Sequence, residues 1–318
     1  MRDADFLPLT SIRRQSMRRR YLQHLVLFLL LVLASCSGDS TPDALGYVFM
    51  SGGVGRSAVF EPSTGKIQEI AWPYDWFDPT FLCRGSGDTI LLLSDRAPDS
   101  VGRYGQFICK WLPPASKLTV VRETSPPGFW CRRLDYSPLR KQYLYSGEYN
   151  FRRGVFLLDS NFELIREIVG ANAGDKKPIA CNAYFVSGDT VVAMIRDSIF
   201  YVNTALVERR LLTVGSQLTQ FFYSSDRIVG MQVTPPDDTR FFTLTRTRPD
   251  VELLEIERDA CAAALSPDGS WLIIARDRDF LDWRRLEFVN IIDGRVYHTD
   301  IRVGCGPLLW VTEVGFSW

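Results

Sequence analysis

A short serine-centred turn that leads into an apolar strand recurs along this chain. Each copy follows a short apolar run, and its turn is built from Gly, Pro, Asp or Ser, which is the pattern of an antiparallel β-hairpin. The five copies are SGDTILLLSD from Ser86, SPLRKQYLYSG from Ser137, SGDTVVAMIRD from Ser187, SSDRIVGMQV from Ser224 and SPDGSWLIIARD from Ser266. We therefore predict an all-β chain.

A second family of segments, each a strand, a polar turn and another strand, alternates with the serine hairpins. Its six members cover residues 57–70, 107–121, 154–168, 198–212, 241–256 and 286–301. Equivalent positions in these members lie 43 to 51 residues apart, namely Phe60, Trp111, Leu157, Tyr201, Leu244 and Asn290. The repeating unit is therefore about four strands long.

Four antiparallel strands that recur at this interval are typical of a β-propeller. We predict six blades, in which the serine hairpins form the two inner strands and the second family forms the two outer strands. A β-solenoid is the structural rival, but its repeats are usually much shorter.

The two ends of the chain are predicted to share one blade. Pro307 to Thr312 supplies an inner strand about 46 residues after Ser266, with no outer strands after it, whereas residues 46–70 supply outer strands without an inner one. Pairing these segments closes the ring and leaves no open gap.

The segment Leu265-Ser266-Pro267-Asp268-Gly269, followed by the strand Trp271 to Ala275, resembles the WD40-like repeat of TolB-type propellers. That resemblance implies a six-bladed propeller in a periplasmic or surface setting. The tetrapeptide is also a tight-turn sequence, because Pro presets φ and Gly supplies a positive φ. We therefore assign Asp268 to the turn and not to catalysis.

The N-terminal region reads as an export signal. Arginines up to Arg20 precede ten apolar residues, Leu25 to Ala34, which as a helix would cross only about half of a ~30 Å hydrocarbon core. Leu33-Ala34-Ser35-Cys36 resembles the lipobox of bacterial lipoproteins, which implies diacylation of Cys36 and removal of residues 1–35. An ordinary cleaved signal is the alternative.

This interpretation sets the predicted organisation of the chain. Residues 1–35 form the signal peptide, residues 36–44 the lipidated N-terminus with a flexible tether, and residues 45–318 the propeller domain. The resemblance to bacterial lipoproteins also implies, from Ser37 directly after the cysteine, sorting to the outer membrane of the envelope. Without residues 1–35 the chain has 31 Lys and Arg against 35 Asp and Glu, a net charge of about −4, so no nucleic-acid partner is expected.

Six cysteines follow Cys36, an even number that permits disulfides in an exported protein. Cys131, Cys181, Cys261 and Cys305 all precede an inner strand, and we test Cys131 with Cys181 and Cys261 with Cys305 as bridges between adjacent blades. A bridge between Cys83 and Cys109 is not expected, because they fall two strands apart. The alternative for all six is a buried free thiol.

Aromatic residues gather in two connections between blades, AWPYDWFDPTF (71–81) and SPPGFW (125–130). Large rigid side chains beside arginines are good anchors for a partner, and the alternative is that these rings pack between blades. The candidate contact residues are Trp72, Tyr74, Trp76, Phe77, Phe129, Trp130, Arg84 and Arg132.

The function these patterns favour is a noncatalytic, membrane-anchored binding module for a protein partner. A glycan ligand, or an enzyme that uses carboxylates of the channel such as Asp88, Asp135 and Asp189, is the alternative. His298 is the one histidine beyond the signal and is predicted in an outer strand, which argues against a Ser-His-Asp triad. We predict no catalytic residue, no metal site and no cofactor.

Overall fold

The chain divides into two units, Met1–Ser40 and Thr41–Trp318. Within the second unit, the computed structural model describes residues 46–51, 57–72, 77, 79–85, 88–96, 105–113, 118–124, 129–170, 182–195, 198–205, 209–214, 218–234, 238–245, 248–252, 260–276, 284–303 and 306–312. The predicted signal peptide, Cys36 and the tether lie outside the described residues.

The described residues form 24 strands in six four-stranded antiparallel sheets. In chain order the strands are β1 (Tyr47–Ser51), β2 (Ser57–Glu61), β3 (Lys66–Ile70), β4 (Pro79–Arg84), β5 (Ile90–Arg96), β6 (Gly105–Trp111), β7 (Leu118–Thr124), β8 (Phe129–Ser137), β9 (Gln142–Tyr149), β10 (Arg152–Leu158), β11 (Leu164–Gly170), β12 (Ala183–Ser187), β13 (Thr190–Ile195), β14 (Ser198–Asn203), β15 (Arg209–Val214), β16 (Leu218–Ser224), β17 (Arg227–Thr234), β18 (Asp238–Thr245), β19 (Arg248–Glu252), β20 (Ala260–Leu265), β21 (Trp271–Arg276), β22 (Arg284–Asn290), β23 (Val296–Val303) and β24 (Leu308–Val311). Within the ranges given above, no helix is long and apolar enough to cross a membrane.

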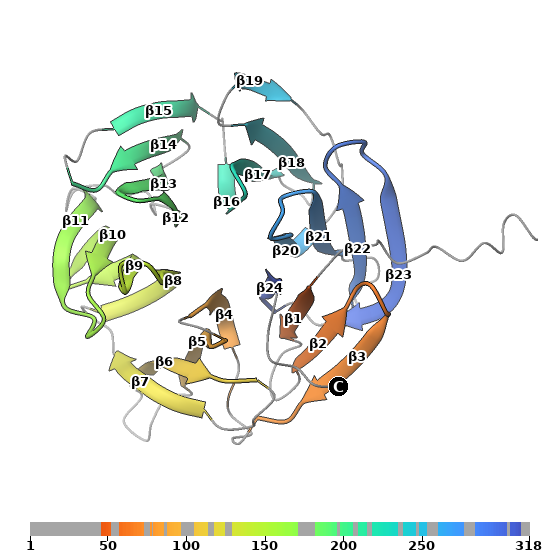
Figure 1. Ribbon diagram of the computed structural model, residues 1–318, viewed down its shortest axis with the longest axis horizontal. Helices are drawn as coiled ribbons and strands as arrows, with labels where there is room; N and C mark the ends of the chain where they lie inside the picture. The colour runs from red at the N-terminus through yellow and green to blue at the C-terminus, as the bar shows by residue number, and fades with distance from the viewer. Residues whose placement is uncertain are drawn as a thin grey trace, which may run out of the picture. The chain divides into compact units, whose positions relative to one another are not determined.

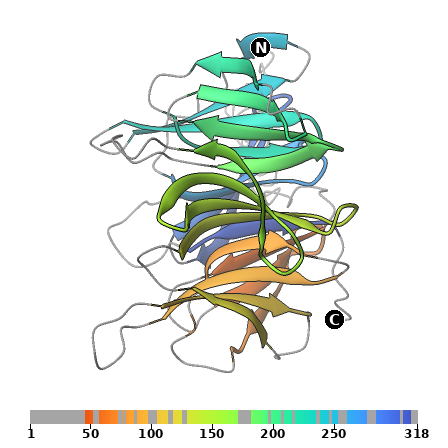
Figure 2. The same ribbon diagram turned by 90° about the vertical axis from the view of Figure 1, so that its left-hand side faces the viewer.

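The sheets are the blades of a six-bladed β-propeller, arranged in a ring about a central axis (Figure 1). The innermost strands are β4, β8, β12, β16, β20 and β24, and Figure 2 shows the ring from the side with the β8–β11 blade facing the viewer. Each of the five serine turns joins the first and second strands of a blade. The predicted fold and the placement of the serine hairpins are therefore confirmed.

The strands differ in burial according to their distance from the channel. Ile90 to Leu93 in β5 are at most 1% exposed, and Leu272 to Ala275 in β21 are fully buried. These second strands are covered on both faces by the neighbouring blades, which explains why they read as continuous apolar runs rather than as an alternating pattern. β3, a rim strand, is mostly exposed and has the sequence KIQEI.

Apolar side chains of adjacent blades form shared cores. Ile273 and Phe288 of the β20–β23 blade pack with Val48 and Phe60 of the blade that holds both chain ends. Each blade thus stabilises its neighbours by removing apolar surface from water.

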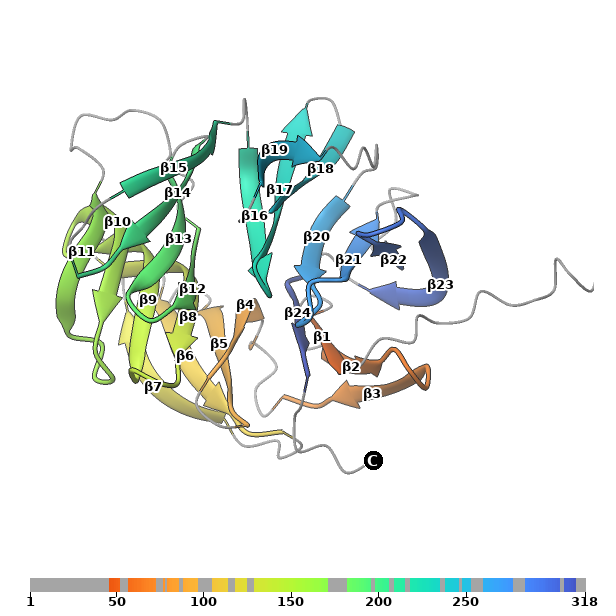
Figure 3. The ribbon, with the colours of Figure 1, turned by 45° about the horizontal axis from the view of Figure 1, so that its top comes forward.

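The blade that closes the ring has the order β24-β1-β2-β3 (Figure 3). β24 pairs antiparallel with β1 from Tyr47↔Val311 to Met50↔Leu308, and the Ser51 N–H donates to the Pro307 carbonyl oxygen at 3.1 Å. The prediction that the two ends of the chain complete one blade is confirmed. We call this sheet the closing blade.

Glycines at both ends of the β1–β24 pair permit the close approach of the two strands. A Cβ on Gly46 would lie 2.2 Å from the Val311 carbonyl oxygen, and a Cβ on Gly306 would lie 2.1 Å from the Ser51 carbonyl oxygen. Gly46 also has a φ of 109°, which other residues rarely adopt. Any side chain at these two positions would push the closing strands apart.

The Ser266–Gly269 turn has the role expected from its sequence. The Asp268 carboxylate accepts hydrogen bonds from the Ser266 and Ser270 hydroxyls, both at 2.5 Å, and Gly269 has a φ of 72°. Asp268 therefore stabilises the turn, as predicted.

Trp310 tests the contribution of closure to stability. Its side chain is 5% exposed and meets the Phe288 ring edge-on at 5.6 Å, so it fills the core between the closing blade and the β20–β23 blade. We expect Trp310→Ala to lower the free energy of unfolding by about 3 to 5 kcal/mol, measured by urea denaturation. Leu139→Ala, at an 87% exposed turn position, is the control and should change it by less than about 0.5 kcal/mol. Equal stability of the two variants would contradict a structural role for closure.

Candidate functional site in the central channel

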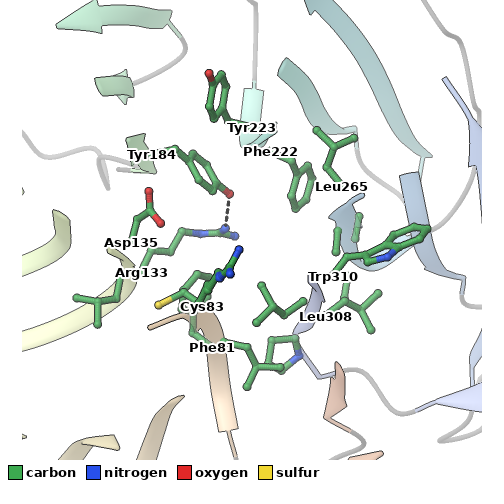
Figure 4. Close-up of a pocket in the computed structure, with 18 of the residues that line it drawn as sticks. Phe81, Cys83, Arg133, Asp135, Tyr184, Phe222, Tyr223, Leu265, Leu308 and Trp310 are labelled. Atoms are coloured by element: carbon green, nitrogen blue, oxygen red, sulfur yellow. Dashed lines mark hydrogen bonds between the residues drawn. The ribbon is translucent and has the colours of Figure 1, made fainter. Parts of the chain in front are cut away.

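The inner strands surround a cavity of about 580 Å³ at the centre of the ring (Figure 4). All six blades contribute to its wall. The lining includes Phe81, Cys83 and Arg84 of β4, Arg133 and Asp135 of β8, Tyr184 of β12, Phe222 and Tyr223 of β16, Leu265 of β20, and Leu308 and Trp310 of β24. A cavity of this volume is large enough for a small organic molecule.

A β-bulge in β8 decides which of its side chains reach the cavity. The register of β8 against β9 shifts between Cys131 and Arg133, which makes Arg132 the extra residue. An extra residue reverses the alternation of side chains along a strand. Cys131 and Leu134 are consequently buried in one core cluster, whereas Arg133 and Asp135 are half-buried and line the cavity.

The Arg133 guanidinium connects several blades across the cavity (Figure 4). Its Nη1 donates to the Tyr184 hydroxyl at 3.4 Å, and that hydroxyl donates to the Phe221 carbonyl oxygen at 3.1 Å. The guanidinium carbon also lies 5.2 Å from the centre of the Phe81 ring, within cation–π distance. Burial lowers the pKa of Arg133 and the contact with Tyr184 opposes that shift, so the guanidinium keeps its charge.

The Asp135 carboxylate is held by backbone groups rather than by an arginine. Oδ2 accepts a hydrogen bond from the Phe185 N–H at 2.7 Å, and Oδ1 accepts one from the Tyr136 N–H at 2.9 Å. Burial raises the pKa of Asp135 to about 6, although both hydrogen bonds favour the ionised form. Asp135 thus joins β8 to β12 and places a titratable group in the cavity wall.

The wall of the cavity has a polar part and an apolar part. Arg84, Arg133, Asp135 and Tyr184 come from β4, β8 and β12. The apolar part comes from β16, β20 and β24 and is formed by Phe222, Ala262, Ala264, Leu265, Leu308 and Trp310, although β16 also contributes the polar residues Gln220, Tyr223 and Ser224 to the lining. Figure 4 shows Leu265, Leu308 and Trp310 on the opposite side of the cavity from Asp135.

Three of the cysteines are free thiols in the protein core. Cys83, Cys109 and Cys131 are at most 5% exposed. Burial raises the pKa of all three thiols, that of Cys109 to about 12, so they remain protonated and poorly reactive at neutral pH. These three follow the alternative interpretation, in which cysteine packs as a small apolar residue.

The predicted bridge between Cys131 and Cys181 is not formed, because Cys131 is a free thiol whose S–H donates to the Arg133 carbonyl oxygen at 3.2 Å. The bulge at Arg132 accounts for the error, since it turns Cys131 into the core cluster beside the β4–β7 blade. Cys181, Cys305 and the side chain of Cys261 lie outside the described residues, so the second pair stays a prediction.

Two of the predicted contact aromatics pack between blades. The Trp72 ring lies 5.1 Å from those of Phe77 and Trp111, and its Nε1–H donates to the Ser57 hydroxyl at 2.8 Å. Phe77 is 1% exposed, so its side chain belongs to the core and is not available to a partner. An aromatic-rich connection can pack inward, and its composition does not reveal which rings do so.

The other candidate contact residues divide into three groups. Tyr74 and Trp76 lie outside the described residues, and of Phe129 and Trp130 only the backbone in β8 is described. Arg132 is exposed at the bulge, and Arg84 is exposed and lines the cavity.

The acidic residues named as alternatives for catalysis have different surroundings. Asp88 and Asp189 are exposed at hairpin turns, and Asp189 pairs with Arg140. Asp135 departs from the expectation for a turn residue, because it is half-buried in the cavity wall.

His298 lies on β23, the outer strand of its blade, as predicted. Its Nδ1 is 2.9 Å from Oε1 of the buried Glu287. Among the residues that the structure describes, no group of three or more His, Cys, Asp or Glu side chains could hold a metal ion.

Several solved structures are similar to this one. TolB from Acinetobacter baumannii matches with a TM-score of 0.63 at 13% identity, over 89% of this chain and 69% of that one. A chain of a nidogen/laminin complex matches with a TM-score of 0.61 at 9% identity, over 84% and 99%. The fold is that of a TolB-like β-propeller.

The comparisons also include an enzyme. A periplasmic gluconolactonase from Pseudomonas aeruginosa, PpgL, matches with a TM-score of 0.51 at 11% identity, over 84% of this chain and 99% of that one. A scan against protein-family models and a search of the curated proteins both find no match. At these identities the similarity concerns the fold alone.

Sequence reasoning did not identify Arg133 and Tyr184 as cavity residues. Both belong to inner strands that were predicted. Their positions in the sequence, four residues before Ser137 and three before Ser187, were the signal that could have placed them in the channel wall. The bulge at Arg132 prevented its use, because simple alternation would have put Arg133 on the same side as Cys131.

Asp135 gives the stability a specific dependence on pH. In the unfolded chain an Asp is protonated only below about pH 4, whereas the raised pKa keeps Asp135 protonated in the folded state up to about pH 6. The folded state therefore binds more protons between these values, and the free energy of unfolding falls as pH rises from 4 to 6. We expect Asp135→Asn to reduce this fall by about 1 kcal/mol, after allowance for solvent at a half-buried group.

The measurement is urea denaturation at pH 4, 5 and 6 for the wild type, Asp135→Asn and Asp88→Asn. The exposed Asp88 serves as the control, and its variant should follow the wild type. Parallel pH profiles for the wild type and Asp135→Asn would show that Asp135 titrates at its ordinary pKa.

Proposed function

We propose that this protein is a lipid-anchored binding module of the bacterial envelope, in which a noncatalytic propeller presents one face to a protein partner. The lipobox-like Leu33-Ala34-Ser35-Cys36 supports export and acylation of Cys36. The Pseudomonas aeruginosa neighbour is named as a periplasmic protein, which agrees with an envelope location. The nidogen/laminin neighbour was solved as part of a protein–protein complex.

The observation that carries the contact surface is the adjacency of β4 and β8. The two inner strands pack in one core cluster through Cys83, Cys131 and Leu134, and the Gln106 side chain bonds the Cys131 backbone at 2.7 and 2.8 Å. The aromatic connections 71–81 and 125–130 lead into these two strands. Both connections therefore arrive at neighbouring positions of the ring.

The first connection is fixed on both sides of Tyr74 and Trp76. Trp72 before them and Phe77 after them pack against each other and into the core. A contact segment with fixed ends loses little conformational entropy on binding, which favours a recognition role. Arg132, exposed on β8, adds a charged group beside the second connection.

An enzyme is the second candidate, and Asp135 is the observation in its favour. A carboxyl group with a pKa of about 6 in a cavity is suited to general acid–base catalysis. Both oxygens of Asp135, however, already accept backbone N–H groups of β8 and β12. These bonds give the carboxylate a structural task, so binding is the function we favour.

Acylation of Cys36 can be tested directly. Cells that express the full chain with an alkyne-bearing palmitate analogue should label it in the membrane fraction, because the thiol of Cys36 is the expected acceptor. Cys36→Ser should lose the label and the membrane association, whereas Cys83→Ser, at a buried thiol, should keep both. Labelling that persists in Cys36→Ser would contradict the lipoprotein assignment.

Partner binding can be tested by cross-linking and affinity capture from envelope membranes. The variant Trp76→Ala/Trp130→Ala should lose the partners that the wild type captures, because both rings are expected to contact them. Phe151→Ala removes an aromatic ring that is 74% exposed in another turn and should capture the same partners as the wild type. Loss of the captured material on protease treatment distinguishes a protein from a glycan. Capture of the same partners by all three forms would exclude the proposed surface.

A further inference from the structure

The strongest unexplained feature of the channel is the charge of Arg133. Its polar contact is the Tyr184 hydroxyl at 3.4 Å, which is a neutral group, and its other contact is the face of the Phe81 ring. No ion pair joins Arg133 to a carboxylate of the described residues. A guanidinium has five N–H donors. Most of those of Arg133 therefore point at no carboxylate or carbonyl oxygen of the residues that the structure describes.

The carboxylate best placed to neutralise Arg133 is engaged elsewhere. Asp135 lies two residues further along β8 on the same side of the strand, and it accepts the N–H groups of Phe185 and Tyr136. Desolvation of a cation without an opposite charge is costly unless a ligand supplies that charge. The cavity therefore contains a positive group that suits an anion.

A second cation points to the same conclusion. Arg84 lines the same cavity and makes no ion pair with the described residues. Two guanidinium groups and one carboxylate give the described lining an excess of positive charge. Guanidinium groups bind carboxylates and related oxyanions through paired N–H donors.

The opposite wall indicates what the rest of the ligand is. Phe222, Leu265 and Leu308, with Ala262 and Ala264, present apolar surface from β16, β20 and β24. The lining residues of these three strands include no charged side chain, although β16 also contributes Gln220, Tyr223 and Ser224. An inorganic anion would leave the apolar part of this surface in contact with water. An organic acid with an apolar body satisfies both walls at once.

We propose that the central channel is a binding site for a small organic monoanion, with Arg133 holding the acidic group and the Phe222, Leu265 and Leu308 wall packing the apolar body. The cavity of about 580 Å³ accommodates a molecule of this kind. The proposal does not rest on the partner surface, because Arg133 and the apolar wall are not among the residues assigned to that surface; Arg84 is named for both.

The test uses matched ligands and the full chain purified in detergent. We expect 4-phenylbutyrate to bind with a dissociation constant of about 0.1 to 1 mM in calorimetric titration. The neutral 4-phenylbutanamide and the cationic 4-phenylbutylamine should each bind at least about tenfold more weakly, because Arg133 recognises negative charge. Acetate should also bind at least about tenfold more weakly, because it lacks the apolar body.

Variants identify the residue responsible. Arg133→Met should weaken 4-phenylbutyrate at least about tenfold and leave the amide unchanged. Arg153→Met, at an arginine of β10 whose side chain is 64% exposed and does not line the cavity, is the control and should bind as the wild type does. Because all forms are measured in the same detergent, partitioning of the ligand into micelles affects them equally.

Three results would overturn the proposal. These are equal affinity of the wild type for the carboxylate and the amide, unchanged affinity for the carboxylate in folded Arg133→Met, and no binding of the carboxylate by about 10 mM. If Arg133→Met does not fold, the comparison of carboxylate, amide and amine on the wild type decides the question. Failure of partner capture has no bearing on any of these outcomes.

Discussion

Pairing of the last strand with the first is the constraint on which the rest of the structure depends. Neighbouring blades touch mainly through apolar side chains, which attract one another without directional preference. The β24–β1 hydrogen bonds turn a row of such blades into a ring of fixed size. The cavity exists because of that ring, since its lining comes from all six inner strands, from β4, the first in chain order, to β24, the last.

Hydrogen bonds join neighbouring blades both near the channel and on the outer strands. Gln106 bonds the Cys131 backbone reciprocally, and the Ser224 and Ser225 hydroxyls both donate to the Pro267 carbonyl oxygen at 2.6 Å. In each case a polar group of one blade meets its complement in the next, as buried polar groups generally do. Arg133 differs, because its partners in the neighbouring blades leave its charge uncompensated. This contrast is the reason to assign it a ligand rather than a purely structural task.

The blades could be predicted because periodicity and turn chemistry depend on local sequence. The serine turns and the 43 to 51 residue spacing specify hairpins and their order, and closure follows from the missing strand at each end. The site could not be predicted to the same extent. A single extra residue at Arg132 reverses the sides of Cys131 and Arg133, and comparable register shifts occur at Thr219 in β16 and Cys261 in β20. Similarly, the inward packing of Trp72 and Phe77 depends on Trp111 and Ser57, which lie on other strands.

The positive charge of the channel is a consequence of how β8 and β12 are joined. Arg133 and Asp135 share one side of β8, about 7 Å apart along the strand, a distance at which two flexible side chains could form an ion pair. The Phe185 N–H holds the Asp135 carboxylate toward β12 at 2.7 Å and so keeps it from the guanidinium. Such a pair would neutralise Arg133 and remove the feature that favours an anion. The contact that fixes two blades to each other is therefore also the contact that keeps the arginine available, so the architecture and the binding property of the channel depend on the same hydrogen bond.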